Sequence, residues 1–575
     1  MKKITKIIAG ILLSTTTLSC FAGCGSNYEV DSTKTQLYVQ LTSGGFGREW
    51  LDNAIADFEE SQAQVSYEDD KMGVQLIVDY VEGANISTMA TSANELIFYE
   101  DLSYINYVAQ RTFLDISDVV TKVLPADNKS IADKLSKEQK DHLTSVDGNY
   151  YAIPLYESYF SFMYDVDVFD EYCLYFAEDK TQDDFVTDLS QTRSKGPDGR
   201  TGIVDGVDYS ADDGLPATYV EMFKLFDRML LRDVTPFVYT GESPNYVRKF
   251  LVALVAQMIG SQQFSAHYSM EGQVSVIDGF EEEYYHLAEG VDIPIGKEKI
   301  VDIQPSTGYQ LTQEKGKYYS LAFLEAMLSN PEYYYEDVIS GVFSHLDAQE
   351  EFIYGKLEGN PIGMLVDGSY WMNEAKEAIQ RSIDDKGDKA RNRRYAVMPL
   401  PRVVDGEVAP GKHTLIDVVN AYAFVNGNIA NKPHKIKLAK AFLEYLYTDE
   451  AMQAFTVTTG TKLALDYKIT EAQYQQLDHF QQSCWDWVTN ADIVYMNASS
   501  DYYVRSGGLG AYTYFGDTNG MYASNLEKSG HKYSFNLPQK CLMKGISNPL
   551  FTSKEYFLGT ARTSAEWENA YGEWF

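Results

Sequence analysis

The chain has little cysteine and a marked shortage of basic side chains. Its 575 residues include five cysteines, 48 lysines and arginines, and 83 aspartates and glutamates, which gives a formal charge of −35 at pH 7. Beyond residue 24 only Cys173, Cys484 and Cys541 occur, too few and too widely spaced for a metal cluster or a dense disulfide framework. A surface this acidic repels phosphates, so nucleic acid is not expected as a partner.

Long apolar runs are also missing after the N-terminus. The longest is residues 250–260, FLVALVAQMIG, which is too short to span a bilayer and predicts a buried helix. The eight histidines show no metal-ligand spacing, and neither an H-x-x-x-H pair nor a G-x-S-x-G nucleophile elbow occurs. We therefore expect no cofactor and no enzymatic activity.

Residues 1–23 have the three-part pattern of a secretory signal peptide. Three lysines lie within the first six residues, an apolar core runs from about Ile7 to Leu18, and small residues follow. The core is too short for a comfortable membrane span. The pattern predicts export of the rest of the chain across the cytoplasmic membrane.

Cys24 follows Ala22 and Gly23, where a signal peptidase would cut. This stretch resembles the bacterial lipobox, although Phe21 stands where leucine is usual. The resemblance implies a lipoprotein in which Cys24 is diacylated, for example with palmitate, and anchors the chain at the extracytoplasmic face of the cell membrane, since two acyl chains suffice for stable anchoring. Residues 24–35 would form a flexible tether. The alternative is an ordinary signal peptide with Cys24 free or disulfide-bonded.

The chain then alternates between strand and helix patterns. Residues 35–42 alternate apolar and polar side chains, a glycine-rich turn follows, and residues 48–60 are amphipathic with helical spacing. Further strands are predicted at 74–81 and 95–100. This order predicts an α/β fold with a parallel sheet covered by helices. In such sheets ligands lie beyond the C-terminal strand ends, which points to residues 44–46 and 99–100.

Several segments match one family in their order and spacing. They are GGFGREWLDNAIADFEE; ELIFYE with FLDISDVV; DGNYYAIPLYESYFSFMYDVDVFDE; GPDGRTG, DDGLPATYVEMFKLFDRML and TPFVYTGE; GMLVDGSYWMNEA; YAVMPLP; and AKAFLEYLYTDEAMQAFTVTTG. Together they resemble the family 1 extracellular solute-binding proteins of carbohydrate-uptake ABC transporters. One departure is MYDVD at 163–167, where relatives often carry Tyr-Asn-Lys. Residues 466–575 match no part of this pattern.

The resemblance implies a periplasmic-binding-protein-like fold, in which two α/β lobes are joined by a hinge and the ligand cleft lies between them. Residues 36–155 with 410–465 would form lobe 1. Residues 156–409 with 466–575 would form lobe 2 and a helical C-terminal extension. Such a protein is a monomer that captures a soluble sugar or oligosaccharide by lobe closure and delivers it to the permease subunits in the membrane.

Other functions fit parts of the same sequence. A peptide-binding receptor of the same superclass would need a longer cleft, and a surface glycan-binding adhesin would use the aromatic side chains without import. A glycoside hydrolase is a further alternative, because two carboxylates flanking a bond suffice for hydrolysis and Asn373-Glu374 is similar to an acid motif of some hydrolases. Against it, the sequence predicts that Glu374 opens a helix, and no eightfold strand–helix series is present.

The 44 tyrosines favour a sugar ligand, because an aromatic face contacts the C–H patch of a pyranose while carboxylates accept its hydroxyl protons. For each aromatic residue, core packing is the alternative. The resemblance makes Trp371 a stacking platform. The candidate binding residues are Gly45, Phe46, Tyr99, Glu100, Tyr156, Glu157, Ser158, Asp213, Tyr239, Tyr370 and Trp371.

An acidic, glycine-rich stretch at residues 196–219 raises the question of a cation. Asp198, Asp205 and Asp208 could supply oxygen ligands of the kind calcium prefers, but their spacing lacks the order of an EF-hand and its terminal glutamate. Aspartate and glycine also make turns. We therefore expect no metal site, with this loop as the calcium alternative.

Overall fold

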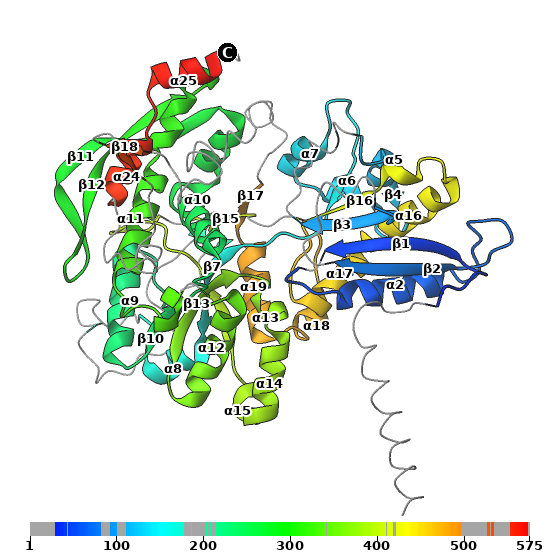
Figure 1. Cartoon of the computed structure of the whole chain (residues 1–575), viewed down its shortest axis with the longest axis horizontal. Coiled ribbons are helices and arrows are strands. Elements are labelled where there is room, and N and C mark those ends of the chain that lie inside the picture. The colour runs from blue at the N-terminus through cyan, green and yellow to red at the C-terminus, as the bar shows by residue number, and fades with distance from the viewer. Residues whose placement is uncertain are drawn as a thin grey trace, which may run out of the picture.

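The computed structural model describes residues 29–42, 44–81, 92–100, 108, 111–176, 186, 203–204, 207–208, 214–340, 342–409, 411–417, 421–495, 526–528, 531–533 and 552–572. These residues form two α/β lobes, each built on its own sheet, and the lobes lie side by side in Figure 1. Among them no helix is long and apolar enough to cross a membrane. Cys24 and the signal sequence lie outside the described residues.

The sheet of lobe 1 has the strand order β2-β1-β3-β16-β6. Strand β1 is parallel to β2 and β3, whereas β16 is antiparallel to β3 and β6. Helices α2, α16 and α17 pack against this sheet or each other. The bounds are β1 (Thr35–Thr42), α2 (Glu49–Ser61), β2 (Val74–Val81), β3 (Leu96–Glu100), β6 (Ile153–Pro154), β16 (Ala421–Val425), α16 (Pro433–Leu446) and α17 (Asp449–Thr459).

The sheet of lobe 2 has the order β10-β13-β7-β14, with β10 parallel to β13 and β7 antiparallel to both β13 and β14. Helices cover it, and α10 contains the apolar stretch 250–260, where Phe250, Leu251 and Leu254 are fully buried as expected. The bounds are β7 (Phe160–Asp165), α8 (Val166–Tyr172), α9 (Tyr219–Leu231), β10 (Thr235–Val238), α10 (Pro244–Ser269), α11 (Lys315–Ser329), α12 (His345–Glu358), β13 (Ile362–Gly368), α13 (Trp371–Glu374), α14 (Lys376–Lys386), α15 (Asp388–Arg391) and β14 (Tyr395–Met398).

The chain passes between the lobes more than once. It runs from β6 to β7 through residues 155–159, returns through β15, and passes back through α18 to α19 and β17. These crossings are joined to one another: Leu155 N–H donates to the carbonyl of Ala421 at 2.8 Å, and β15 pairs in parallel with β17. The bounds are β15 (Thr414–Ile416), α18 (Glu471–Tyr474), α19 (His479–Thr489) and β17 (Asp492–Val494).

A long two-stranded hairpin stands at the side of lobe 2 and encloses a second, smaller core. Its strands β11 (Gly272–Ala288) and β12 (Val291–Ile303) pack with η2 (Pro305–Gln313) and with the C-terminal helices α24 (Ser553–Thr560) and α25 (Ser564–Tyr571). The indole of Trp567 is fully buried there, and its Nε1 donates to the Pro305 carbonyl at 2.8 Å.

Further described elements are short. They are α5 (Ser117–Val120), β4 (Val123–Leu124), β5 (Lys129–Ser130), α6 (Ile131–Lys134), α7 (Lys137–Leu143), β8 (Ile203–Val204), β9 (Val207–Asp208), η3 (Glu336–Ser340), η4 (Gly427–Ile429), β18 (Leu526–Lys528) and β19 (His531–Tyr533).

Trp567→Ala should destabilise the hairpin region locally. Removing a fully buried tryptophan costs about 3–5 kcal/mol, because the cavity it leaves collapses only in part. Hydrogen–deuterium exchange should therefore become faster in β11, β12 and η2 while β1 in the other lobe is unchanged. The control is Tyr284→Ala on β11, whose side chain is half exposed and whose removal should matter little. Unchanged exchange in Trp567→Ala would contradict a C-terminal segment that stabilises this core.

Candidate ligand-binding site between the lobes

A glycine turn after β1 brings the backbone of lobe 1 against lobe 2. A Cβ placed on Gly45 would lie 2.6 Å from Cγ and Cδ2 of Tyr370, and one placed on Gly44 would lie 2.6 Å from Cδ of Glu100. Both distances are far below any real contact of a Cβ atom. Glycine therefore lets the turn approach the Tyr370 ring closely at position 45, whereas at position 44 the atoms in the way are the flexible end of the Glu100 side chain, which can move aside.

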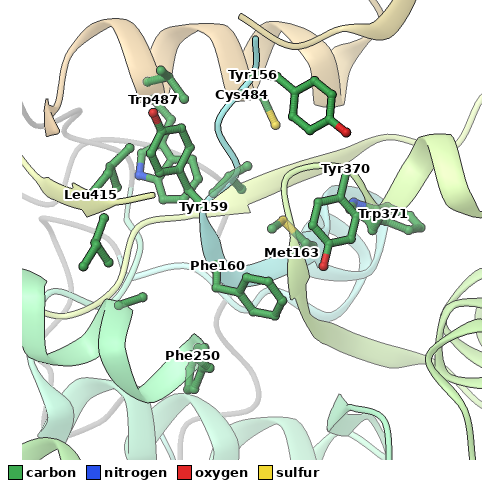
Figure 2. Close-up of a cluster of buried hydrophobic side chains, with 14 of the residues drawn as sticks. Tyr156, Tyr159, Phe160, Met163, Phe250, Tyr370, Trp371, Leu415, Cys484 and Trp487 are labelled. Carbon is green, nitrogen blue, oxygen red and sulfur yellow. The ribbon is translucent and has the colours of Figure 1, made fainter. Parts of the chain in front are cut away.

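Aromatic rings from both lobes meet at this turn. Phe46 of lobe 1 lies edge to face with Tyr156, at 4.6 Å between ring centroids, and with Tyr370 of lobe 2, at 6.2 Å. Tyr370 in turn contacts Phe160 at 6.2 Å, and Figure 2 shows its ring between Tyr156 and Phe160. The rings of Phe46, Tyr156 and Tyr370 are buried, so the two lobes are closed on each other here.

Carboxylates also gather at this interface. Glu100, at the end of β3, accepts a hydrogen bond from the Tyr156 hydroxyl. On the lobe 2 side, Gln349 Nε2 donates to Oδ2 of Asp367 at 3.0 Å and to Oε2 of Glu374 at 2.9 Å. One amide group therefore bridges two acids, the buried Asp367 at the end of β13 and the partly buried Glu374 on α13.

Burial of these acids disfavours their charged forms. Burial raises the pKa of Glu374 to about 7, and the Glu100 carboxylate of the other lobe adds to the rise. Burial also raises the pKa of Asp367 well above its ordinary value, and the charge of Glu374 adds to it. The ammonium of Lys249 on α10 opposes both shifts. Near neutral pH this cluster therefore holds protons that isolated carboxyl groups would release.

Direct polar contacts join the lobes at the rim of this interface. Lys376 Nζ on α14 lies 2.5 Å from Oε2 of Glu49 on α2. Asn373 Nδ2 on α13 donates to the carbonyl of Thr459, at the end of α17, at 2.9 Å. Residues 370–376 of lobe 2 therefore carry contacts to several parts of lobe 1.

A second buried polar cluster lies on the crossing segment itself. The Glu157 carboxylate accepts hydrogen bonds from Gln139 Nε2, at 3.0 Å, and from the Tyr159 hydroxyl. Burial raises the pKa of Glu157. Ser158 N–H donates to Oδ1 of Asp417, on the returning segment, at 3.2 Å. Ser158 thus joins the two crossing segments, and Glu157 joins its segment to α7 of lobe 1. In Figure 2 Tyr159 packs beside Trp487.

Two aromatic residues predicted for the cleft are placed in the core of lobe 2. Trp371 is fully buried, with ring centroids 5.6 Å from Phe352, 5.2 Å from Tyr395 and 5.6 Å from Phe480. Tyr239 is buried against Phe237 and Tyr334. This placement favours the core-packing alternative for both residues. A stacking platform for a ligand needs an exposed ring face, which Trp371 lacks in this closed arrangement.

The remaining predicted residues divide between the interface and undescribed segments. Tyr99 is buried beside Glu100 and pairs with Tyr422 in the β3–β16 ladder. Asp213, Asp198 and Asp205 lie outside the described residues, and of Asp208 only the backbone, in β9, is described. Within the described part of the chain, no three His, Cys, Asp or Glu side chains are grouped so as to hold a metal ion.

Sequence reasoning did not assign Asp367, Gln349 or Lys249 to this interface. A signal for Asp367 was present, since it is the next-to-last residue of β13 and lies three residues before Tyr370 in the segment GMLVDGSYWMNEA. Gln349 and Lys249 lie on helices remote in sequence, and only the packing of α12 and α10 on the lobe 2 sheet brings them to the cluster.

Gly45→Ala should hold the lobes apart. The added methyl group would overlap the Tyr370 ring, so the closed arrangement loses its closest contact. With both chains saturated by a sugar that calorimetry shows to bind, small-angle X-ray scattering should show a larger radius of gyration for Gly45→Ala than for the wild-type chain. In a double-mutant cycle, Tyr370→Gly removes both the ring and the Cβ that the methyl group meets, so adding Gly45→Ala to it should have little further effect. Equal effects of Gly45→Ala in both backgrounds would contradict a direct clash.

Glu374→Gln should make the folded chain less sensitive to rising pH. The folded-state pKa of Glu374, about 7, lies above its ordinary value of 4.5, so ionisation costs more in the folded than in the unfolded state. The contribution of this group to stability is therefore lost as the pH rises through about 7. The melting temperature of Glu374→Gln should therefore gain on that of the wild type between roughly pH 4.5 and 7 and keep that gain at higher pH. The exposed Glu377→Gln is the control, and a pH-independent difference for Glu374→Gln would contradict the assignment.

No family model and no curated protein matches the chain. Several solved structures are similar to it at low identity. A chitin oligosaccharide binding protein shares 14% identity at a TM-score of 0.49, over 94% of this chain and 100% of the other. An ABC substrate-binding protein from Listeria monocytogenes, in complex with cycloalternan, shares 11% at 0.48, over 94% and 99%. SBP RafE in complex with raffinose shares 13% at 0.48, over 91% and 100%.

Proposed function

We propose that this protein is the substrate-binding component of an ABC importer and that it binds a sugar or oligosaccharide between its two lobes. The observation that carries the proposal is the convergence of aromatic rings and carboxyl groups from both lobes on one interface, around Phe46 and Glu100 of lobe 1 and Tyr370 and Glu374 of lobe 2. A ligand that contacts both sides shifts the equilibrium toward the closed arrangement.

The chemistry of these groups suits a sugar. The ring faces of Phe46, Tyr156 and Tyr370 provide flat apolar surface for the C–H patches of a pyranose. The carboxyl groups of Glu100 and Glu374 can accept hydrogen bonds from its hydroxyl groups. In the closed arrangement these rings pack on one another. Opening of the lobes would expose them, and a sugar would then take the place of part of the ring–ring contact.

We further propose that Cys24 is acylated and that residues 24–35 tether the lobes to the extracytoplasmic face of the cell membrane, beside permease subunits that receive the sugar. The lobes would comprise residues 36–155 with 410–465, and 156–409 with 466–575. This proposal is supported by the order of the N-terminal segments: a charged start, a short apolar core, small residues and a cysteine.

Calorimetric titration of the full chain with a panel of neutral oligosaccharides tests the binding function. We expect at least one saturable ligand, and a ligand at a hundred times its dissociation constant should add about 2.7 kcal/mol to the stability of the fold. Tyr370→Ala should weaken binding at least about tenfold, because it removes the stacking surface, whereas Tyr370→Phe keeps the ring and should bind nearly as well as the wild type.

Other responses would point elsewhere. Saturable binding of peptides with no response to any sugar would contradict the proposal. Release of shorter sugars from a bound oligosaccharide, abolished in Glu374→Gln, would instead indicate a hydrolase that uses the Glu100 and Glu374 carboxyl groups.

A further inference from the structure

Residues 29–34, the part of the proposed tether just before β1, are hydrogen-bonded to lobe 1. The side-chain amide of Gln75, on β2, uses both of its polar atoms. Its Nε2 donates to the Glu29 carbonyl at 3.0 Å, and its Oε1 accepts from the Asp31 N–H at 2.9 Å. Gln36 Nε2, on β1, donates to the Asp31 carbonyl. Lobe 1 therefore holds the chain from Glu29 onward.

This attachment lies at the edge of the lobe 1 sheet that faces away from the interface between the lobes. Strands β1 and β2 are parallel, and residues 29–34 precede β1 as residues 68–73 precede β2. The Met72 N–H donates to the Thr33 carbonyl at 3.0 Å, so the two segments lie side by side. The other end of β1 leads to Gly45 at the interface. We call residues 29–34 and 68–73 the tether face.

The tether face is close to Cys24 along the chain. Residues 25–28 separate Cys24 from Glu29, so five peptide units join the two. They span at most about 18 Å, because an extended chain advances about 3.3–3.6 Å per residue. The headgroup layer of one leaflet takes up about 5–7 Å of this reach. With Cys24 acylated, Glu29 therefore lies no more than about 13 Å above the headgroups.

The exposed side chains of the tether face suit a headgroup surface. Val30 and Met72 are apolar and about half exposed, so they would gain from contact with the boundary between headgroups and acyl chains. The carboxylates of Asp69 and Asp70 are also exposed, and charged groups are excluded from hydrocarbon. This combination favours contact at the level of the headgroups without deeper insertion.

We propose that the tether face of lobe 1, and not lobe 2, lies against the headgroup surface of the membrane. This inference rests on the proposed acylation of Cys24. It also limits the partner that receives the ligand, because lobe 1 cannot rise more than about 13 Å above the headgroups. Such a partner has to present its docking surface near the headgroups, as a membrane-embedded subunit without a tall extracellular domain does.

Quenching by nitroxides on lipid headgroups tests this arrangement. The full chain, expressed with its signal sequence, is incorporated into phosphatidylcholine vesicles and carries a bimane fluorophore at Met72→Cys, in a background with Cys173→Ser and Cys541→Ser. Because such quenching acts only at short range, we expect this probe to lose at least about half of its emission. The matched control is the same fluorophore at Leu346→Cys, an equally exposed position on α12 of lobe 2, which should lose much less.

A longer tether separates the effect of reach from other contacts. Ten glycine and serine residues inserted between Tyr28 and Glu29 add about 17 Å of mean reach, so the Met72 probe should recover at least half of its lost emission. Equal quenching at Met72 and Leu346, or quenching at Met72 that the insertion leaves unchanged, would overturn the proposal.

Mass spectrometry of the same samples shows whether Cys24 is acylated. An unmodified Cys24 would contradict the proposed anchor and this inference together. An acylated chain whose Met72 probe is not quenched would contradict this inference alone. Sugar binding, measured by calorimetry on the same chain, is independent of both results.

Discussion

The closed arrangement of the two lobes depends on the contact between the Gly44–Gly45 turn and the Tyr370 ring. No side chain larger than glycine fits at Gly45, and the neighbouring Phe46 ring extends the contact over Tyr156 and Tyr370. The lobes therefore contact each other through apolar rings at the centre of the interface and through the Lys376–Glu49 ion pair at its rim. Rim ion pairs contribute little, so the ring contacts determine how readily the lobes part.

Electrostatics work against this attraction. In the closed arrangement the Asp367 carboxyl group is buried, and the charge of Glu100 of the other lobe raises the pKa of Glu374. Buried like charges are unfavourable, so closure without a ligand is opposed unless protons are retained. The hydroxyl groups of a sugar would stabilise these carboxylates by donating hydrogen bonds. A bound sugar would therefore shift the equilibrium between the open and closed arrangements toward the closed one. The second polar cluster, around Glu157, lies on the crossing segments, which the hydrogen bond from Ser158 to Asp417 joins to each other.

The regular elements near the site follow from the sequence, and most side-chain roles do not. Alternating apolar residues predicted strands at 35–42, 74–81 and 95–100, and the structure confirms β1, β2 and β3 there. An aromatic residue carries no such signal, because tertiary packing decides whether its ring faces a core or a cleft: Tyr370 lies at the interface and the adjacent Trp371 is buried. Likewise, only packing brings Gln349 to Asp367.

Small-angle X-ray scattering of the full chain, with and without a sugar that calorimetry shows to bind, tests the central claim most directly. If the lobes close on a sugar, the radius of gyration decreases on saturation, and the curve with sugar agrees with the closed arrangement in which Gly45 meets Tyr370. A radius of gyration that stays the same while the sugar is fully bound would show that binding does not close the lobes, and would contradict this account.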